Sequence, residues 1–369
     1  MARDRVGYEQ VLTAIGACIA TRIPFLLWGE PGAGKTAVVE SATDSGWHVE
    51  TLICSHYEPS DFAGLPVVSA GRVDLAPPQW AVRVAEEPGP SVVFFDEWTT
   101  ASPAVQAAAL RPLTHGEVGA LRLPERVSFG AAANPADVAA SGWELAAPTA
   151  NRFVHLEWRL PLDVFTESLV TGMWPRIAVP TLDDAYPARV ATARGQVAAF
   201  LSVRSAQLSS IPKDAAGRGR AFPTPRTWDY AARLLAAVAP RDTAAARLLV
   251  HGAIGAPTGH EFLSWLAALD LPDPETLLAQ PDGDLLAGLR ADRVHVALQG
   301  LLAAVSTRTT PERWESAATV CVRAAELSGV DPAVPVIRSL LRIRPARAAL
   351  PSGLSVFAGP LALAGLLPS

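Results

Sequence analysis

The chain has 369 residues, of which 50% are hydrophobic and 18% charged, and a formal net charge of −5 at pH 7. This length is too great for one ordinary small domain and predicts two. No unbroken apolar run approaches the roughly eighteen residues of a membrane span, and the acidic charge balance argues against a surface that binds nucleic acid.

The cysteine pattern and the N-terminus indicate the cellular setting. Cys18, Cys54 and Cys321 are widely spaced and form no CxxC pair, which predicts reduced core thiols, and the seven scattered histidines argue against a structural zinc site. Asp4 and Glu9 precede the first apolar run, which argues against a signal peptide. We therefore expect a cytoplasmic protein.

The first predicted elements surround a glycine-rich loop. Apolar residues at helical spacing predict a helix over residues 8–20. The apolar run Phe25–Trp28 predicts a buried strand, and a loop and a second helix follow it. The loop has the pattern GxxxxGK[ST] in the strand–loop–helix context that this pattern requires.

The loop supplies the candidate nucleotide-binding residues, which are Gly29, Glu30, Pro31, Gly32, Ala33, Gly34, Lys35, Thr36 and Ala37. Backbone N–H groups of such a loop cradle phosphate oxygens at a helix N-terminus. Lys35 would contact the β- and γ-phosphates, and the Thr36 hydroxyl would be a ligand of Mg²⁺. Lys35 and Lys213 are the only lysines in an arginine-rich chain, and one of them occupies the motif position. The sequence therefore predicts ATP and Mg²⁺ as cofactors.

A pair of carboxylates ends a later strand. Residues 48–54 predict the second strand, and residues 66–89 predict a short hairpin, with its turn at Ala70 and Gly71, and then a helix. The run from Ser91 to Asp96-Glu97 is typical of a central parallel strand whose carboxyl end opens on a ligand. Asp96 is placed to hold Mg²⁺, and Glu97 is placed to orient and deprotonate the attacking water.

Two more polar residues follow in chain order. A helix over residues 103–113, a turn over residues 114–117 and strand material over residues 118–123 and 126–132 lead to Asn134, at the end of a strand that we expect beside the Asp-Glu strand. Arg152 stands at the entry of a fifth strand that we expect over residues 151–158. From the residues alone, Asn-Pro is also an ordinary turn signal, and an exposed arginine commonly has no special role.

The alternation of strands ends near residue 160. We expect a nucleotide-binding core over residues 1–160, a connecting segment over residues 161–222 and an all-helical region over residues 223–369. The predicted helices of the last region cover residues 226–238, 243–253, 261–269, 294–305, 312–328 and 332–342. The predicted fold is α/β, a three-layer αβα core around a parallel sheet, followed by an all-α lid.

From about Tyr8 to Arg226, the order of motifs resembles that of the AAA+ ATPases, and among them the MoxR family of the helix-2-insert clade. The segments that carry the resemblance are 29–36, 94–98, 132–135, 151–153 and 223–228. The loop over residues 59–66 and the hairpin before the Asp-Glu strand point to MoxR and its relatives. The resemblance implies the three-layer core and lid described above.

The resemblance also implies roles for three residues and for the assembly. Asn134 looks like the sensor that polarises the lytic water, Arg152 like an arginine finger that reaches the γ-phosphate of a neighbouring subunit, and Arg226 like a second sensor on the lid. MoxR relatives imply a homo-oligomeric ring, expected to be a hexamer, that remodels or assembles a partner protein, such as one with a von Willebrand factor A domain. The chain departs from the family pattern at residues 98–100, which read Trp-Thr-Thr rather than an Ile-Asn-Arg-like sequence, and at Asn151, where Asp is common.

Three alternatives stay open. The chain could be the ATPase subunit of a metal chelatase, a nucleic-acid-dependent NTPase of the same clade, or a scaffold that binds nucleotide without hydrolysing it. The net charge of −5 counts against nucleic acid. Because Lys35, Thr36, Asp96 and Glu97 are all present, the sequence favours hydrolysis over a degenerate site.

Overall fold

The computed structural model describes residues 2–69, 71–135, 143–239, 241–269 and 271–359. The chain packs into two compact units. The first comprises the residues up to 182 together with residues 209–260, and the second comprises residues 183–208 together with the residues from 261 onward. The chain therefore enters the second unit, returns to the first and then completes the second.

A five-stranded parallel sheet lies at the centre of the first unit, with the strand order β2-β5-β8-β1-β9. The strands are β1 (Phe25–Trp28), β2 (His48–Ile53), β5 (Ser91–Asp96), β8 (Val127–Ala133) and β9 (Val154–Glu157). All residues of β1 and β8 are buried, as expected for parallel strands covered on both faces. The predicted parallel sheet is confirmed.

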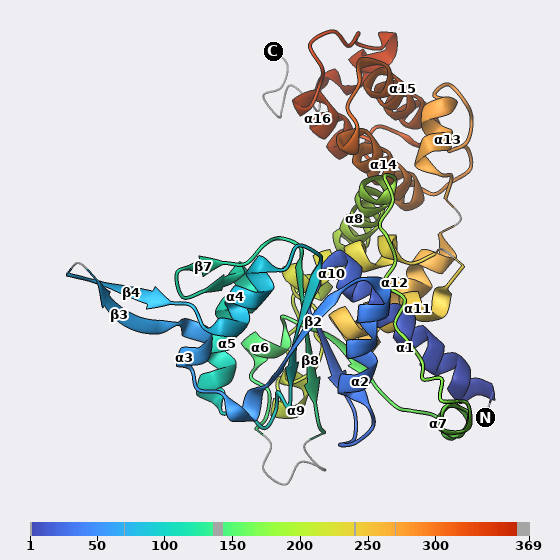
Figure 1. The fold of residues 1–369 in the computed structure, drawn as a ribbon. Coiled ribbons are helices and arrows are strands. Elements are labelled where there is room, and N and C mark those ends of the chain that lie inside the picture. The colour runs from blue at the N-terminus through green and yellow to red at the C-terminus, as the bar shows by residue number, and fades with distance from the viewer. Residues whose placement is uncertain (1, 70, 136–142, 240, 270, 360–369) are drawn as a thin grey trace. The chain divides into compact units, whose positions relative to one another are not determined.

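Helices cover both faces of this sheet, so the predicted three-layer α/β architecture is confirmed (Figure 1). One face packs against α3 (Ser60–Ala63), α4 (Gln79–Glu86) and α5 (Pro103–His115) in a single apolar cluster. Near the other face, α1 (Ala2–Thr21) contacts β8 and β9, and α11 (Thr243–Ile254) contacts β9.

A glycine in the central strand permits close aromatic packing within the sheet. Gly130 of β8 pairs with Phe25 of β1 and with Phe94 of β5. A Cβ atom on Gly130 would lie 2.4 Å from the Phe25 ring, and the rings of Phe25 and Phe94 stack with centroids 6.4 Å apart. A larger residue at position 130 would therefore push these two rings away.

The predicted hairpin before the Asp-Glu strand is confirmed. β3 (Leu65–Ser69) and β4 (Arg72–Ala76) pair antiparallel and extend away from the rest of the first unit (Figure 1). Gly71 takes a φ of 75° in the turn, and Ala70 lies outside the described residues. A second, shorter hairpin of β6 (Glu117–Val118) and β7 (Leu121–Arg122) occupies the region where one strand was expected over residues 118–123.

The remaining helical segments of the first unit follow the strands or return from the second unit. They are α2 (Lys35–Glu40), η1 (Ser41–Ser45), η2 (Cys54–His56), α6 (Ala147–Ala150), α7 (Leu162–Thr171), α9 (Ala215–Arg218) and α10 (Pro225–Ala237). The helix α7 lies where the sequence predicts only a connection. The predicted helix over residues 226–238 is confirmed as α10.

The described part of the second unit consists of helices. They are α8 (Tyr186–Val203), η3 (Ser205–Leu208), α13 (Pro274–Ala279), α14 (Ala291–Thr307), α15 (Pro311–Ser328), α16 (Val334–Arg342) and η4 (Ser352–Phe357), and α12 (Ala256–Ala268) begins in the first unit and ends here. The predicted helical character of the C-terminal part is confirmed. None of the helices in the described ranges combines the length and the apolar character needed to cross a bilayer.

Candidate functional site

The glycine-rich loop connects β1 to α2 at the carboxyl edge of the sheet. Gly32 and Gly34 have φ values of 76° and 80°, in the left-handed region that favours glycine. Gly29 is also constrained, because a Cβ atom there would lie 2.6 Å from the carbonyl oxygen of Trp158. Trp158 further braces the loop, since its indole N–H donates to the carbonyl oxygen of Ala33 over 2.8 Å. The backbone conformation and the close packing of the loop therefore require these glycines even without a bound ligand.

Lys35 is the first residue of α2, and its side chain is only 7% exposed. Its ammonium group donates to the carbonyl oxygens of Gly29 at 2.8 Å and Glu30 at 2.9 Å and to Oδ1 of Asn134 at 2.8 Å. Burial lowers the pKa of Lys35, and the nearby charge of Asp96 opposes this shift. All three hydrogen-bond acceptors are neutral, so the lysine charge can still attract an anion at the loop.

The next residue, Thr36, meets the first carboxylate of the Asp-Glu pair. Its hydroxyl donates to Oδ2 of Asp96 over 2.5 Å, although the two residues are sixty positions apart in the chain. Hydroxyl and carboxylate oxygens are ligands that Mg²⁺ accepts. Thr36 and Asp96 are therefore the residues that would hold a magnesium ion at this site.

Glu97 has a strained backbone and an exposed side chain. Its φ of 53° is unusual for a residue that is not glycine. The backbone N–H donates to Oδ1 of Asp96 at 2.8 Å, and the carbonyl oxygen accepts from the N–H of Thr100 at 3.0 Å. The carboxylate accepts a 2.5 Å hydrogen bond from the hydroxyl of Ser55. A tight turn thus presents the Glu97 carboxylate at the end of β5.

The sequence did not single out Ser55 as a site residue. Ser55 follows β2, which pairs with β5 so that Ile53 lies opposite Asp96. A hydroxyl residue just beyond a strand that neighbours the Asp-Glu strand was the available signal. Without the strand order, nothing in the sequence distinguishes it from other serines.

Trp98 explains one departure from the MoxR pattern. The side chain is fully buried, and its ring lies 5.2 Å from Phe95 and 5.7 Å from Phe153, measured between centroids. Its backbone N–H donates to the carbonyl oxygen of Ala132 at 2.8 Å. Position 98 therefore supports the sheet edge from inside the core rather than facing a ligand.

Arg152 lies after α6, and Arg226 is the second residue of α10. The Arg152 guanidinium donates from Nε to the Thr114 hydroxyl at 2.9 Å and also to the carbonyl oxygen of Pro148. Burial, and after it the positive charge of Arg226, lowers the pKa of Arg152. The two guanidinium charges are therefore close enough to affect each other. Among the described residues, the hydrogen-bond partners of Arg152 lie outside the loop and the Asp-Glu pair.

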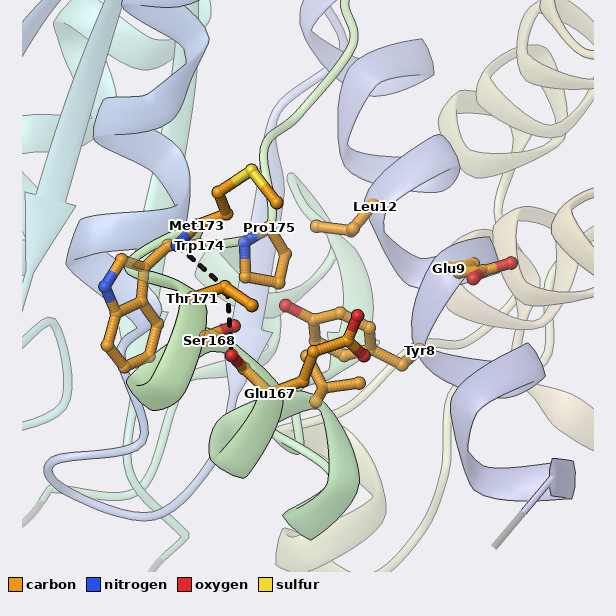
Figure 2. A pocket seen from close by; sticks show the side chains of 10 residues that line it. Tyr8, Glu9, Leu12, Glu167, Ser168, Thr171, Met173, Trp174 and Pro175 are labelled. Atoms are coloured by element: carbon orange, nitrogen blue, oxygen red, sulfur yellow. Dashed lines mark hydrogen bonds between the residues drawn. The ribbon is translucent and has the colours of Figure 1, made fainter.

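One cavity adjoins the loop and a second lies nearby. One of about 650 Å³ is lined by loop residues 29–33, by Pro135 and by residues 157–160 that follow β9. A second, of about 260 Å³, lies between α1 and α7 and contains the side chains of Tyr8, Leu12 and Trp174 (Figure 2). The centroid of the Tyr8 ring lies 5.1 Å from that of Trp158, and Trp158 donates a hydrogen bond to the loop. The side chain of Trp158 therefore separates this second cavity from the glycine-rich loop.

The site residues predicted from the sequence therefore fall into two groups. Hydrogen bonds join Lys35 to Asn134 and Thr36 to Asp96, Lys35 and Thr36 are consecutive residues, and Glu97 adjoins this group through its contact with Asp96. Arg152 lies outside this group, with hydrogen bonds to Thr114 and Pro148, and the charge of Arg226 acts on it. Cys18, Cys54 and Cys321 are buried free thiols, and the described residues include no cluster of three His, Cys, Asp or Glu side chains arranged to bind a metal.

Solved structures with a similar course of the chain have low sequence identity. An inferred ATPase from Cytophaga hutchinsonii is 16% identical, with a TM-score of 0.39 over 67% of this chain and 83% of its own. A full-length MCM homologue from Methanopyrus kandleri is 17% identical, with a TM-score of 0.39 over 70% of this chain and 55% of its own. NtrX from Brucella abortus is 15% identical, with a TM-score of 0.25 over 90% and 67%. TM-scores below 0.5 add nothing to the functional argument.

The comparison with curated proteins gives no match. The comparison with protein-family models matches residues 24–153 to the AAA domain of the dynein-related subfamily. The matched range begins just before β1 and ends just before β9, so it contains the glycine-rich loop, the Asp-Glu pair, Asn134 and Arg152. The chain therefore contains an AAA domain over residues 24–153.

Proposed function

We propose that this chain binds ATP together with Mg²⁺ and hydrolyses the bond to the γ-phosphate. The observation that carries the proposal is the convergence of two distant motifs at the carboxyl edge of one sheet. Lys35 reaches Asn134, and Thr36 reaches Asp96, each through one direct hydrogen bond. Glu97 stands beside them with an exposed carboxylate.

Each residue has a distinct part in the proposed reaction. Lys35 would exchange the loop carbonyl oxygens that it now contacts for phosphate oxygens, and the loop N–H groups would hold the same phosphates. Thr36 and Asp96 would hold the magnesium ion, which neutralises phosphate charge when bound. Glu97 would orient and deprotonate the attacking water, and Asn134 would hold that water in line.

We further propose that the nucleoside end of ATP occupies the cavity beside Tyr8. A planar base favours stacking on aromatic side chains and burial in an apolar hollow. Tyr8 and Trp174 supply such surfaces in the 260 Å³ cavity, and Tyr8 is linked to the loop through Trp158.

The proposed active form is a homo-oligomeric ring of the MoxR type, with the hexamer as the expected size. Arg152, the expected arginine finger, would contact the γ-phosphate bound to a neighbouring copy, which agrees with its hydrogen bonds outside the loop of its own chain. We extend this role to Arg226, the expected second sensor, because its charge acts on Arg152. The client would be a protein, for example one with a von Willebrand factor A domain. The β3–β4 hairpin supports a protein client, because Leu65, Val67, Val68 and Val73 are 56%, 46%, 76% and 66% exposed.

Two substitutions test the hydrolysis itself. In Glu97→Gln, we expect phosphate release to fall about 10²-fold or more while ATP still binds, because the general base is lost and the loop is unchanged. In Lys35→Ala, both ATP binding and hydrolysis should be lost. Phosphate release and the dissociation constant of a fluorescent ATP analogue measure the two effects.

Glu125→Gln is the matched control, since Glu125 is exposed and lies at the amino end of β8, at the opposite edge of the sheet. It should leave turnover unchanged. Tight ATP binding by the wild-type protein without phosphate release at any protein concentration would overturn the proposal in favour of a nucleotide-binding scaffold.

A further inference from the structure

The two arginines of the proposed trans-acting pair stand on separate elements, and one buried side chain connects those elements. Asn151, at the end of α6, is 7% exposed. Its Nδ2 donates to the carbonyl oxygen of Phe222 at 3.3 Å, and its Oδ1 accepts from the hydroxyl of Thr224 at 2.9 Å. Asn151 immediately precedes Arg152, whereas Phe222 and Thr224 immediately precede the helix that carries Arg226.

The far end of this connection is itself rigid. Thr224 is the N-cap of α10, and it forms a capping box with Thr227. The Thr227 hydroxyl also donates to the carbonyl oxygen of Phe222 at 3.1 Å, and Thr227 is 1% exposed. The start of α10, including Arg226, is therefore fixed to the segment that Asn151 contacts through its hydrogen bonds.

Only an amide fits both hydrogen bonds of Asn151. A carboxamide offers a donor and an acceptor on one short side chain, whereas an ionised carboxylate only accepts. An aspartate at position 151 would place its charge against the carbonyl oxygen of Phe222. The chain thus has Asn at a position where the resembling family commonly has Asp, and the contact with Phe222 requires the difference.

The positive charges of Arg152 and Arg226 oppose a close approach of the two guanidinium groups. Burial, and after it the positive charge of Arg226, lowers the pKa of Arg152, and these two like charges repel each other. Neutral hydrogen bonds from buried groups can resist this repulsion without cancelling the charges that a phosphate needs.

We propose that Asn151 is a positioning residue that holds Arg152 and Arg226 in a fixed relation, so that each copy presents both guanidinium groups together to the nucleotide on its neighbour. The inference rests on the proposed trans-acting role of the arginines and adds the element that sets their geometry.

The first experiment changes either end of the connection. Asn151→Asp and Thr224→Val should each lower kcat for ATP hydrolysis by about tenfold or more, the worth of one buried hydrogen bond. KM for ATP should stay unchanged, because the loop that binds ATP is intact. Thr224→Ser keeps the hydroxyl and should restore kcat.

A matched control separates positioning from general stability. Asp242 caps α11 in the same unit, with its carboxylate accepting from the N–H of Ala245 at 3.0 Å. Asp242→Ala loses a helix cap but touches neither arginine. It should lower the melting temperature as much as Thr224→Val does and leave kcat unchanged well below that temperature. A similar loss of kcat in Asp242→Ala would overturn the positioning role.

The second experiment mixes subunits and distinguishes the two proposals. Lys35→Ala subunits lack a working loop but retain their arginines, whereas Asn151→Asp subunits retain the loop. If Asn151 acts only through arginines delivered to a neighbour, mixtures of the two inactive proteins should regain hydrolysis. Arg152→Ala mixed with Lys35→Ala tests trans delivery itself.

The pattern of recovery identifies which proposal fails. Recovery with Arg152→Ala but not with Asn151→Asp would show that Asn151 is needed by its own loop, and would overturn this inference alone. Failure of both mixtures, with assembly intact by light scattering, would overturn the trans-acting arginines and the positioning role with them.

Discussion

His155 sits at the end of a short chain of contacts that begins one residue before the glycine-rich loop. The indole N–H of Trp28 donates to Nδ1 of His155 at 2.9 Å, so this nitrogen carries no proton. The other nitrogen, Nε2, lies 2.9 Å from the carbonyl oxygen of Ala150 and must therefore be the donor. The guanidinium of Arg220 lies 3.9 Å from the Trp28 ring. The surroundings thus specify a neutral imidazole in one tautomer.

This environment predicts a pH dependence of stability. Burial, with a smaller contribution from the Arg220 charge, lowers the pKa of His155 to about 4 from its ordinary value of 6.5. The unfolded chain then binds a proton at higher pH than the folded protein does, so stability is present above pH 6.5 and is lost as the pH falls from 6.5 to about 4. The loss attributable to His155 should total about 3 kcal/mol.

The measurement compares the wild type with His155→Gln, whose amide can accept from Trp28 and donate to Ala150 without titrating. The difference in free energy of unfolding between the two proteins should favour the wild type at neutral pH and shift toward the variant as the pH falls. A difference that stays constant between neutral pH and pH 4.5 would show that His155 is not held neutral by the fold.

Site residues that belong to a sequence motif could be predicted from the sequence. Site residues whose partners become neighbours only when the chain folds could not. The loop pattern and the Asp-Glu pair named Lys35, Thr36 and Asp96, and in the structure Thr36 is hydrogen-bonded to Asp96 and Lys35 to Asn134. Ser55 and the double role of Asn151 could not be named, because their partners lie on elements that become neighbours only in the folded chain. Catalytic roles for Glu97, Asn134, Arg152 and Arg226 stay predictions.

At the scale of elements, the sequence predicted strands most clearly where nearly every residue of the strand is buried. Continuous apolar runs predicted β1 and β5, whose residues are almost all buried, since strands covered on both faces read as unbroken apolar sequence. The helix α7 was missed because its apolar residues do not lie on one buried face: Leu162, Leu169 and Val170 are 72%, 65% and 86% exposed. The helix α5 continues to His115 rather than turning at residue 114, because Gly116, with a φ of 64°, is the residue that ends it.

The helix α1 offers a paired test of element packing. A Cβ atom on Gly16 would lie 2.3 Å from the carbonyl oxygen of Ala178, in the segment after α7. The neighbouring Ile177 is tied to the first unit, because its N–H donates to the Ser41 hydroxyl at 2.9 Å. We expect Gly16→Ala to lower the free energy of unfolding by about 1–2 kcal/mol, since the crowding outweighs the gain in helix propensity.

Gly7→Ala in the same helix is the control with the opposite sign. Among the described residues, no side chain and no backbone from outside its own helical turn lies within 4 Å of a Cβ placed on Gly7, so the substitution should raise the free energy of unfolding by up to about 1 kcal/mol through helix propensity. Urea unfolding of both variants measures the two signs. Equal effects of the two substitutions would mean that the segment after α7 does not press on α1.

At the scale of the whole molecule, the sequence order of the chain conceals how its parts pack. An α/β part before a helical part was predictable from the change in periodicity near residue 160. The second unit, however, takes α8 from the middle of the chain and packs it against α14, about a hundred positions later. Gly195 of α8 permits this approach, since a Cβ atom there would lie 2.9 Å from the carbonyl oxygen of Gln299. Nothing in the sequence of either helix indicates that the two helices pack together.

The proposed ring predicts that hydrolysis depends on assembly. If Arg152 completes the site of a neighbouring copy, an isolated chain lacks a group worth about 10³-fold in turnover. Phosphate release per chain should therefore rise steeply with protein concentration and reach a plateau where light scattering shows the oligomer to be complete. Arg152→Ala should assemble at the same concentrations yet stay near the rate of the dilute wild type.

Arg290→Ala is the control for that dependence, because Arg290 belongs to the second unit and its side chain is 81% exposed. This variant should follow the wild-type curve in both assembly and rate. If instead the rate per chain is the same in dilute and concentrated wild-type protein, one copy suffices for hydrolysis. Arg152 then has no partner to serve, and its contacts with Thr114 and Pro148 serve only the stability of its own chain.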